Sequence, residues 1–87
     1  MENKELLQTR NKLDEIDRTL MSLLDKRADL VMVVGEIKLR ENIPILNKAR
    51  EDEIISKVHG FKNSEYVSHI YIKIIEESKK LEKEKWK

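Results

Sequence analysis

The sequence LDEIDRTLMSLLDKRADLVMVVGEIKLR, residues 13–40, has a regular apolar pattern that predicts a long helix. Its apolar residues recur at alternating steps of three and four, the spacing of one face of an α-helix. The stripe consists of Leu13, Ile16, Leu20, Leu23, Leu30, Val34 and Ile37, with Arg27 in the remaining place. Further apolar residues beside the stripe indicate that more than one neighbour packs against it. Because Leu6 continues the pattern toward the N-terminus, we expect one helix from about residue 4 to residue 41.

Two further helices are expected after this one. Pro44 disfavours helical geometry in the residue before it, so the segment around it should be an extended connector. Asn47 is a good N-cap for a second helix, which Gly60 can end. A third helix should begin near Asn63–Glu65, and its stripe comprises Val67, Ile70, Tyr71, Ile74, Ile75, Ser78 and Leu81. The sequence therefore predicts one all-α domain, residues 1–87, with three helices in the order long, short, long.

The predicted first helix is too long for a compact chain of 87 residues. About 38 helical residues span about 57 Å, whereas a compact chain of this length has a diameter of about 30 Å. Since the apolar stripe follows nearly the whole helix, something must cover the projecting half, and a second copy of the chain is the simplest candidate. A short chain without cysteine also has little core and no disulfide to stabilise it. We therefore expect a homodimer.

Composition and charge exclude several classes of protein. The 18 basic and 17 acidic residues leave a net charge of +1, which argues against a nucleic-acid partner held by phosphate contacts. Two glycines and one proline are too few turn residues for a β-fold. No apolar run approaches a membrane span, and the N-terminus lacks the apolar stretch of a signal peptide, so a soluble cytoplasmic protein is expected. His59 and His69 lack metal-ligand spacing, which predicts surface positions and no metal site.

Basic residues interrupt or border the apolar stripe of the first helix. Arg27 lies within it, and Lys38 follows on nearly the same face, with Cα atoms about 16 Å apart. The two side chains could hold a small dianion between them, although Arg27 could instead be salt-bridged and Lys38 could simply favour the helix dipole. Arg10 lies about 25 Å from Arg27 along the axis. It cannot reach an Arg27 site in its own chain, but in an antiparallel dimer the partner's Arg10 could.

The candidate site residues on the other two helices include one hydroxyl and two carboxylates. Ser78 falls within the third stripe, with Glu82 four residues later on the same face. Arg50 and Glu51 occupy the first turn of the second helix. Each has a plainer explanation, since Ser78 could bond back to a carbonyl, Glu82 could be solvated, and Glu51 could favour the helix dipole. An enzyme built from these groups, without a cysteine nucleophile or a phosphate loop, would act by positioning and electrostatics.

These residues, in this order, resemble the all-helical class of chorismate mutases over about residues 6 to 82. The matching motifs are Leu6-Leu7-x-x-Arg10-x-Lys12-Leu13-x-x-Ile16-Asp17, Leu23-Leu24-x-x-Arg27, Val34-Gly35-x-x-Lys38, Pro44-Ile45-x-Asn47-x-x-Arg50-Glu51 and Ile74-Ile75-Glu76-x-Ser78-x-x-x-Glu82. Each motif is weak alone, but the ordered set is specific. The resemblance, which is to the single-domain form, implies an intertwined homodimer with two equivalent active sites. It implies the Claisen rearrangement of chorismate to prephenate in phenylalanine and tyrosine biosynthesis, without cofactor or metal.

The resemblance also implies roles for the residues around the ether oxygen and the carboxylates. Arg27 should bind a substrate carboxylate, and Lys38 should contact a carboxylate and the ether oxygen. Glu82 should approach the same oxygen from the opposite side, so that Arg27, Lys38 and Glu82 are the expected catalytic residues. Ser78 should hold the ring carboxylate, and Arg10 should bind a carboxylate in the partner's site.

The remaining expected contacts concern the substrate hydroxyl and two variable positions. Glu51 should bind the hydroxyl with help from the backbone around Asn47, and Arg50 should support this network. Position 47 is Asp or Asn in the family, and Asn47 keeps the acceptor and the cap. Position 82 is Gln or Glu, and Glu82 can donate a hydrogen bond only when protonated. Burial favours the neutral form and nearby cations favour the carboxylate, so the sequence leaves its protonation state open.

Two rival functions remain at this point. An isochorismate-pyruvate lyase shares the fold, but its family pattern lacks the Arg50-Glu51 pair and has Gln at position 82. A non-catalytic helical dimerisation module would explain the apolar stripes. It would not explain Arg27 and Ser78 at interior positions.

Overall fold

The computed structural model describes residues 3–84, which form three α-helices and one short 3₁₀ turn. The elements are α1 (Lys4–Arg40), α2 (Lys48–Ser56), the 3₁₀ turn (Lys57–Gly60) and α3 (Ser64–Glu84). No strand occurs among these residues, so the all-α prediction and the order long, short, long are confirmed. The predicted domain, 1–87, also includes positions 1–2 and 85–87, which lie outside the described residues.

Helix α1 is a rod of 37 residues, and the longest dimension of the molecule is 57 Å. The Asn3 side chain caps its start by accepting a hydrogen bond from the Leu6 backbone N–H at 3.1 Å. Asn42 reverses the chain just after its end with a φ of 56°, a left-handed conformation that asparagine tolerates better than most residues. The Ile43 N–H then donates to the Lys38 carbonyl at 2.8 Å, which closes the helix end.

The connector and α2 follow local signals in the sequence. Residues 43–47 contain no helix, as expected around Pro44. The Asn47 side chain accepts a hydrogen bond from the Arg50 N–H at 3.0 Å, which confirms the predicted N-cap. The sequence predicts that this helix runs to Gly60, but its α-helical part ends at Ser56 and the chain tightens into the 3₁₀ turn. Such tightening is common at helix ends.

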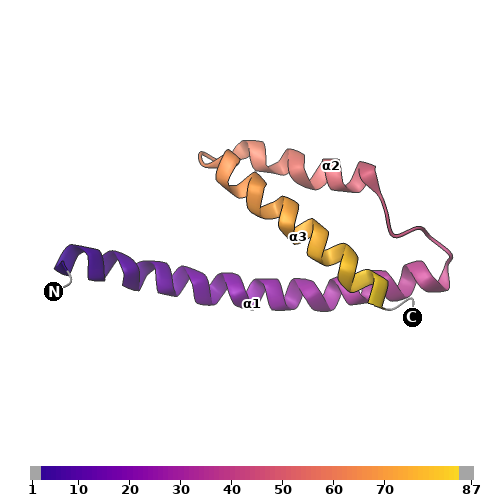
Figure 1. Cartoon of the computed structure of the whole chain (residues 1–87), viewed down its shortest axis with the longest axis horizontal. Coiled ribbons are helices and arrows are strands. Elements are labelled where there is room, and N and C mark those ends of the chain that lie inside the picture. Colours follow the sequence, from indigo (N-terminus) through magenta and orange to yellow (C-terminus); the bar gives the residue numbers. More distant parts are fainter. Residues whose placement is uncertain (1–2, 85–87) are drawn as a thin grey trace.

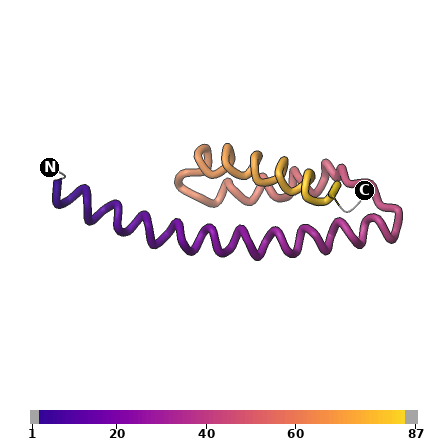
Figure 2. The backbone as a smooth tube through the Cα atoms, turned by 60° about the horizontal axis from the view of Figure 1, so that its bottom comes forward, coloured from indigo at the N-terminus to yellow at the C-terminus, as the bar shows by residue number. Residues whose placement is uncertain are grey.

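Helices α2 and α3 lie on the same side of α1, over its C-terminal half (Figure 1). Turned by 60°, the backbone tube shows α1 passing beneath both helices, with its N-terminal part projecting beyond them (Figure 2). The small core contains Val58 and Ile75, and Gly35 is the buried residue of α1.

The apolar stripe of α1 is mostly uncovered in the single chain. Its exposed members include Leu6, Leu13, Ile16, Leu20, Leu23 and Leu30. Large contiguous apolar surfaces are unusual on monomeric soluble proteins. None of the described helices is both long enough and apolar enough to span a bilayer.

Candidate active site

A cavity of about 270 Å³ lies between the C-terminal half of α1, the start of α2 and the C-terminal half of α3. Its walls are both apolar and charged. The apolar residues that line it are Leu30, Val31, Val34, Ile45, Ile54 and Ile75, and the polar ones are Arg27, Lys38, Asn47, Arg50, Glu51, Ser78, Lys79 and Glu82. Seven of the eight residues predicted for the site therefore line one cavity, although they span positions 27–82 of the chain.

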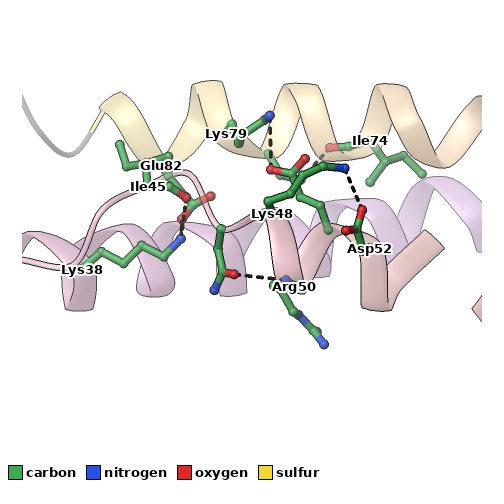
Figure 3. A network of polar contacts seen from close by, with 11 residues as sticks. Lys38, Ile45, Lys48, Arg50, Asp52, Ile74, Lys79 and Glu82 are labelled. Carbon is green, nitrogen blue, oxygen red and sulfur yellow. Dashed lines mark hydrogen bonds and ion pairs between the residues drawn. The ribbon is translucent and has the colours of Figure 1, made fainter. Parts of the chain in front are cut away.

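Lys38 reaches inward from α1 instead of extending into solvent. Its Nζ donates to the Ile45 carbonyl at 2.9 Å and lies 2.8 Å from Glu82 Oε1. The side chains of Lys38 and Glu82 are only 14% and 8% exposed, and Figure 3 shows them pointing toward each other. The interpretation of Lys38 as a helix-end lysine that favours only the dipole is therefore insufficient. The connector that Pro44 keeps extended supplies the carbonyl that holds the ammonium group.

Glu82 is a buried acid on α3. Its Oε1 lies close to the Lys38 ammonium but has no aligned hydrogen-bond donor among the described residues. Most buried polar atoms in proteins are hydrogen-bonded, and an unsatisfied one is often found where a ligand or a reaction uses it. The alternative in which Glu82 is a solvated charge is wrong, because the side chain is buried in the cavity wall.

Arg27 and Ser78 join α1 to α3 across the cavity. Arg27 Nη1 donates to Ser78 Oγ at 2.5 Å, and Ser78 Oγ donates to the Ile74 carbonyl at 2.6 Å. The back-bond to Ile74 is the plainer explanation that the sequence left open for Ser78, and it coexists with the contact to Arg27. Both side chains are half-buried. A guanidinium has several N–H donors, so those of Arg27 that do not bind Ser78 can face a ligand.

Glu51 and Arg50, in the first turn of α2, both line the cavity. Glu51 Oε2 lies 3.3 Å from Lys79 Nζ on α3. The Arg50 guanidinium is instead paired with Glu53, and Figure 3 shows the side chain directed away from Lys79 and Glu82. Sequence reasoning missed Lys79, because nothing in a lysine-rich segment distinguishes it from its neighbours.

Arg10 is the predicted residue that does not line the cavity. It lies in the exposed N-terminal part of α1, seventeen positions before Arg27. This agrees with the expectation that Arg10 cannot serve a site in its own chain.

The site has the chemistry of an anion receptor. Four cationic residues line a cavity with apolar walls, where charge interactions are stronger than in water, and they outnumber the two carboxylates there. The cations are Arg27, Lys38, Arg50 and Lys79, and the carboxylates are Glu51 and Glu82. His59 and His69 are exposed, as predicted. Within residues 3–84, no group of three or more His, Cys, Asp or Glu side chains is arranged to hold a metal ion.

The chain is similar to several known proteins. Residues 9–83 match the family model of chorismate mutase type II. A chorismate mutase of Methanocaldococcus jannaschii is 35% identical, and the alignment covers 93% of this chain and 87% of that protein. A solved structure of a conserved hypothetical protein from Pyrococcus furiosus superimposes with a TM-score of 0.82 at 32% identity, over 93% of this chain and 99% of that one.

Other relatives are much longer. A bifunctional chorismate mutase/prephenate dehydratase of Aquifex aeolicus is 38% identical over 92% of this chain. The chain spans only 24% of that relative's length, about a quarter of it. The family model nevertheless includes most of α1 and α3, the whole of α2 and every cavity-lining residue named above. The chain belongs to the chorismate mutase type II family.

Proposed function

We propose that this protein converts chorismate to prephenate, an isomerase reaction in phenylalanine and tyrosine biosynthesis. The observation that carries the proposal is the convergence of Arg27–Ser78 and Lys38–Glu82 on one cavity of α1 and α3. Chorismate is a dianion with two carboxylates, an ether oxygen and a ring hydroxyl. The cavity offers cations for the carboxylates and donors for the oxygen.

The proposed chemistry is a Claisen rearrangement within one substrate molecule. The ether C–O bond breaks while a C–C bond forms between the enolpyruvyl group and the ring, so no atom is gained or lost. Arg27 binds one carboxylate and Ser78 helps to hold the ring carboxylate, which favours the compact conformer that can react. No covalent intermediate and no cofactor are needed.

Lys38 and Glu82 are proposed to stabilise the charge that develops on the ether oxygen. The Lys38 ammonium has three N–H donors, of which one goes to the Ile45 carbonyl. Another can therefore point toward the ether oxygen. Protonated Glu82 then donates from the opposite side. Such preorganised donors are usually the largest electrostatic contribution to catalysis.

The start of α2 is proposed to recognise the ring hydroxyl. Glu51 accepts its hydrogen bond, and the backbone around Asn47 assists. Arg50 belongs to this network through its backbone N–H, which the Asn47 side chain binds. The Arg50 guanidinium is paired with Glu53 in the unliganded chain.

The working unit is proposed to be an intertwined homodimer with two equivalent sites. The uncovered apolar stripe of α1 supports this, because a second antiparallel α1 would bury it. The same arrangement would bring the partner's Arg10 to the cavity, where it binds a substrate carboxylate. Neither a nucleic-acid nor a membrane partner is part of the proposal. We place the protein in the cytoplasm, since a chain without cysteine needs no oxidising compartment.

The direct test is to incubate the purified protein with chorismate and to follow the loss of its absorbance. Prephenate should accumulate as the product. A parallel incubation with isochorismate tests the lyase alternative, for which pyruvate would be released. If chorismate is not consumed, the proposed function is wrong.

A further inference from the structure

Two ion pairs of this structure differ from its surface pairs because each joins two helices at the cavity. Lys38–Glu82 joins α1 to α3, and Lys79–Glu51 joins α3 to α2. The surface pairs Lys48–Asp52, Arg50–Glu53, Lys73–Glu76 and Lys80–Glu77 each lie within one helix. The Lys38–Glu82 pair has an expected role in the reaction, but nothing described so far explains the second pair.

The Lys79–Glu51 pair is well sheltered compared with its neighbours. The side chains of Lys79 and Glu51 are 31% and 21% exposed. Those of Lys80 and Glu77, which pair with each other on the same helix as Lys79, are 70% and 68% exposed. An ion pair at the more exposed positions contributes little to stability because water and salt screen it. The partly buried pair is screened less, so the ammonium of Lys79 constrains the Glu51 carboxylate more strongly.

Glu51 needs a cation if it is to serve a site for a dianion. A carboxylate beside two substrate carboxylates would repel them unless its charge is offset. Its neighbour in sequence, Arg50, is paired with Glu53 instead. Lys48 Nζ lies 2.7 Å from Asp52 Oδ1. Asp52 raises the pKa of Lys48 by its hydrogen bond and by its charge, and Glu51 contributes least to that rise. Lys79 is therefore the cation that offsets the charge of the Glu51 carboxylate.

The pair also occupies a distinctive place in the fold. Glu51, Lys79 and Ile75 line the active-site cavity and also a groove on the other side, between α2 and α3. The ion pair thus forms part of the wall between the cavity and this outer groove. Lys79 and Glu51 each line both spaces, and Glu51 belongs to the first turn of α2.

We propose that Lys79 is a positioning residue that holds the Glu51 carboxylate toward the ring hydroxyl of the substrate. This inference rests on the proposed function. Lys79 acts through Glu51 and has no contact with the reacting atoms. It contributes equally to binding of the ground state and the transition state, since the hydroxyl takes no part in the bond changes. Its loss should therefore raise KM and leave kcat nearly unchanged.

The test compares Lys79→Met, which removes the charge and keeps an apolar chain in the wall, with Lys79→Arg and the matched control Lys80→Met. With chorismate, Lys79→Met should raise KM about tenfold, the effect of weakening one hydrogen bond to a charged group, and change kcat by less than about threefold. Lys79→Arg should restore KM to within about threefold of the unsubstituted protein, and Lys80→Met should leave both constants unchanged. If Lys79→Met does not fold, Lys79→Gln serves in its place.

A substrate analogue that lacks the ring hydroxyl makes the test specific to Glu51. With this analogue, Lys79→Met should have no effect on KM, and in a Glu51→Gln background the substitution should add little with either compound. An equal rise in KM for both compounds would overturn the inference, because Lys79 would then bind a carboxylate directly. Unchanged KM in Lys79→Met, with an active unsubstituted protein, would overturn the inference and leave the proposed function intact. An unsubstituted protein without turnover would overturn both.

Discussion

At the scale of single residues, the buried acid Glu82 has the most specific consequence. Its Oε1 faces Lys38 without an aligned hydrogen-bond donor in the described part of the chain. In the proposed reaction the ether oxygen gains negative charge at this point. A protonated Glu82 would donate to that oxygen, whereas a carboxylate would repel it. The activity should therefore depend on a proton that a glutamine would not need.

We predict that Glu82→Gln retains activity, because an amide can donate a hydrogen bond to the ether oxygen. Glu82→Ala removes this donor and should lower kcat/KM by a factor on the order of a hundred. The measurement is kcat/KM for chorismate in one buffer at fixed ionic strength. Equal kcat/KM values for Glu82→Ala and the unsubstituted protein would contradict the role of Glu82.

A second residue-scale prediction concerns Arg27. Arg27→Ala should lower kcat/KM by a factor on the order of a thousand, since it removes a charged donor from a partly buried anion site. The circular dichroism spectrum should stay helical, because Arg27 occupies only one place in a long apolar stripe. Arg40→Ala, which removes an exposed arginine from the same helix, is the matched control and should keep normal activity. Near-normal activity of Arg27→Ala would remove Arg27 from the site.

At the scale of elements, the start of α2 depends on one cap. The Asn47 side chain accepts the Arg50 N–H, an interaction that satisfies one of the donors at a helix terminus. The helix has only nine residues, which is too short to be stable alone. Its position, and with it that of Glu51, therefore depends on the cap and on packing against α3.

We predict that Asn47→Ala lowers the free energy of unfolding by about 1 kcal/mol, the usual cost of losing an N-cap. Asn47→Asp, which keeps an acceptor at the same atom position, should retain most of the stability. Urea unfolding at one fixed protein concentration measures both, since the stability of a dimer depends on concentration. Equal stability of Asn47→Ala and the unsubstituted protein would show that the cap is dispensable.

At the scale of the whole molecule, the single chain is more extended than a compact domain. Its radius of gyration is 16.9 Å, whereas a compact chain of this length has about 12 Å. The excess comes from the N-terminal part of α1, which projects beyond α2 and α3 with its apolar stripe uncovered (Figure 1). Pairing with a second copy would bury this stripe and bring Arg10 of one chain near Arg27 of the other.

This arrangement predicts complementation between two inactive variants. Arg10→Ala and Arg27→Ala should each be nearly inactive alone. When they are unfolded, mixed and refolded together, half of the dimers are mixed. Each mixed dimer has one site with both arginines and one with neither, so about one quarter of normal activity should return. Mixed dimers that form without any recovery of activity would show that Arg10 does not act across the interface.

Local signals in the sequence were sufficient to predict where the helices begin. The three-and-four spacing around Leu20 and Leu23 predicted α1 to within about one residue of its end, and Asn47 marked the start of α2. These features depend on neighbours a few residues away, whose contacts follow directly from helix geometry. The end of α2 was less predictable, since a 3₁₀ turn and a continued α-helix differ little in local preference before Gly60.

Which charged groups meet depends on how the three helices pack against one another. Lys79 and Lys80 are adjacent lysines in the same helix, yet one reaches Glu51 on α2 and the other pairs with Glu77 at the surface. One residue is about 100° of rotation on a helix, so the packing of α3 against α1 and α2 selects the lysine that faces inward. The burial of Glu82 beside Lys38 has the same origin, because it depends on residues 44 positions apart in the sequence.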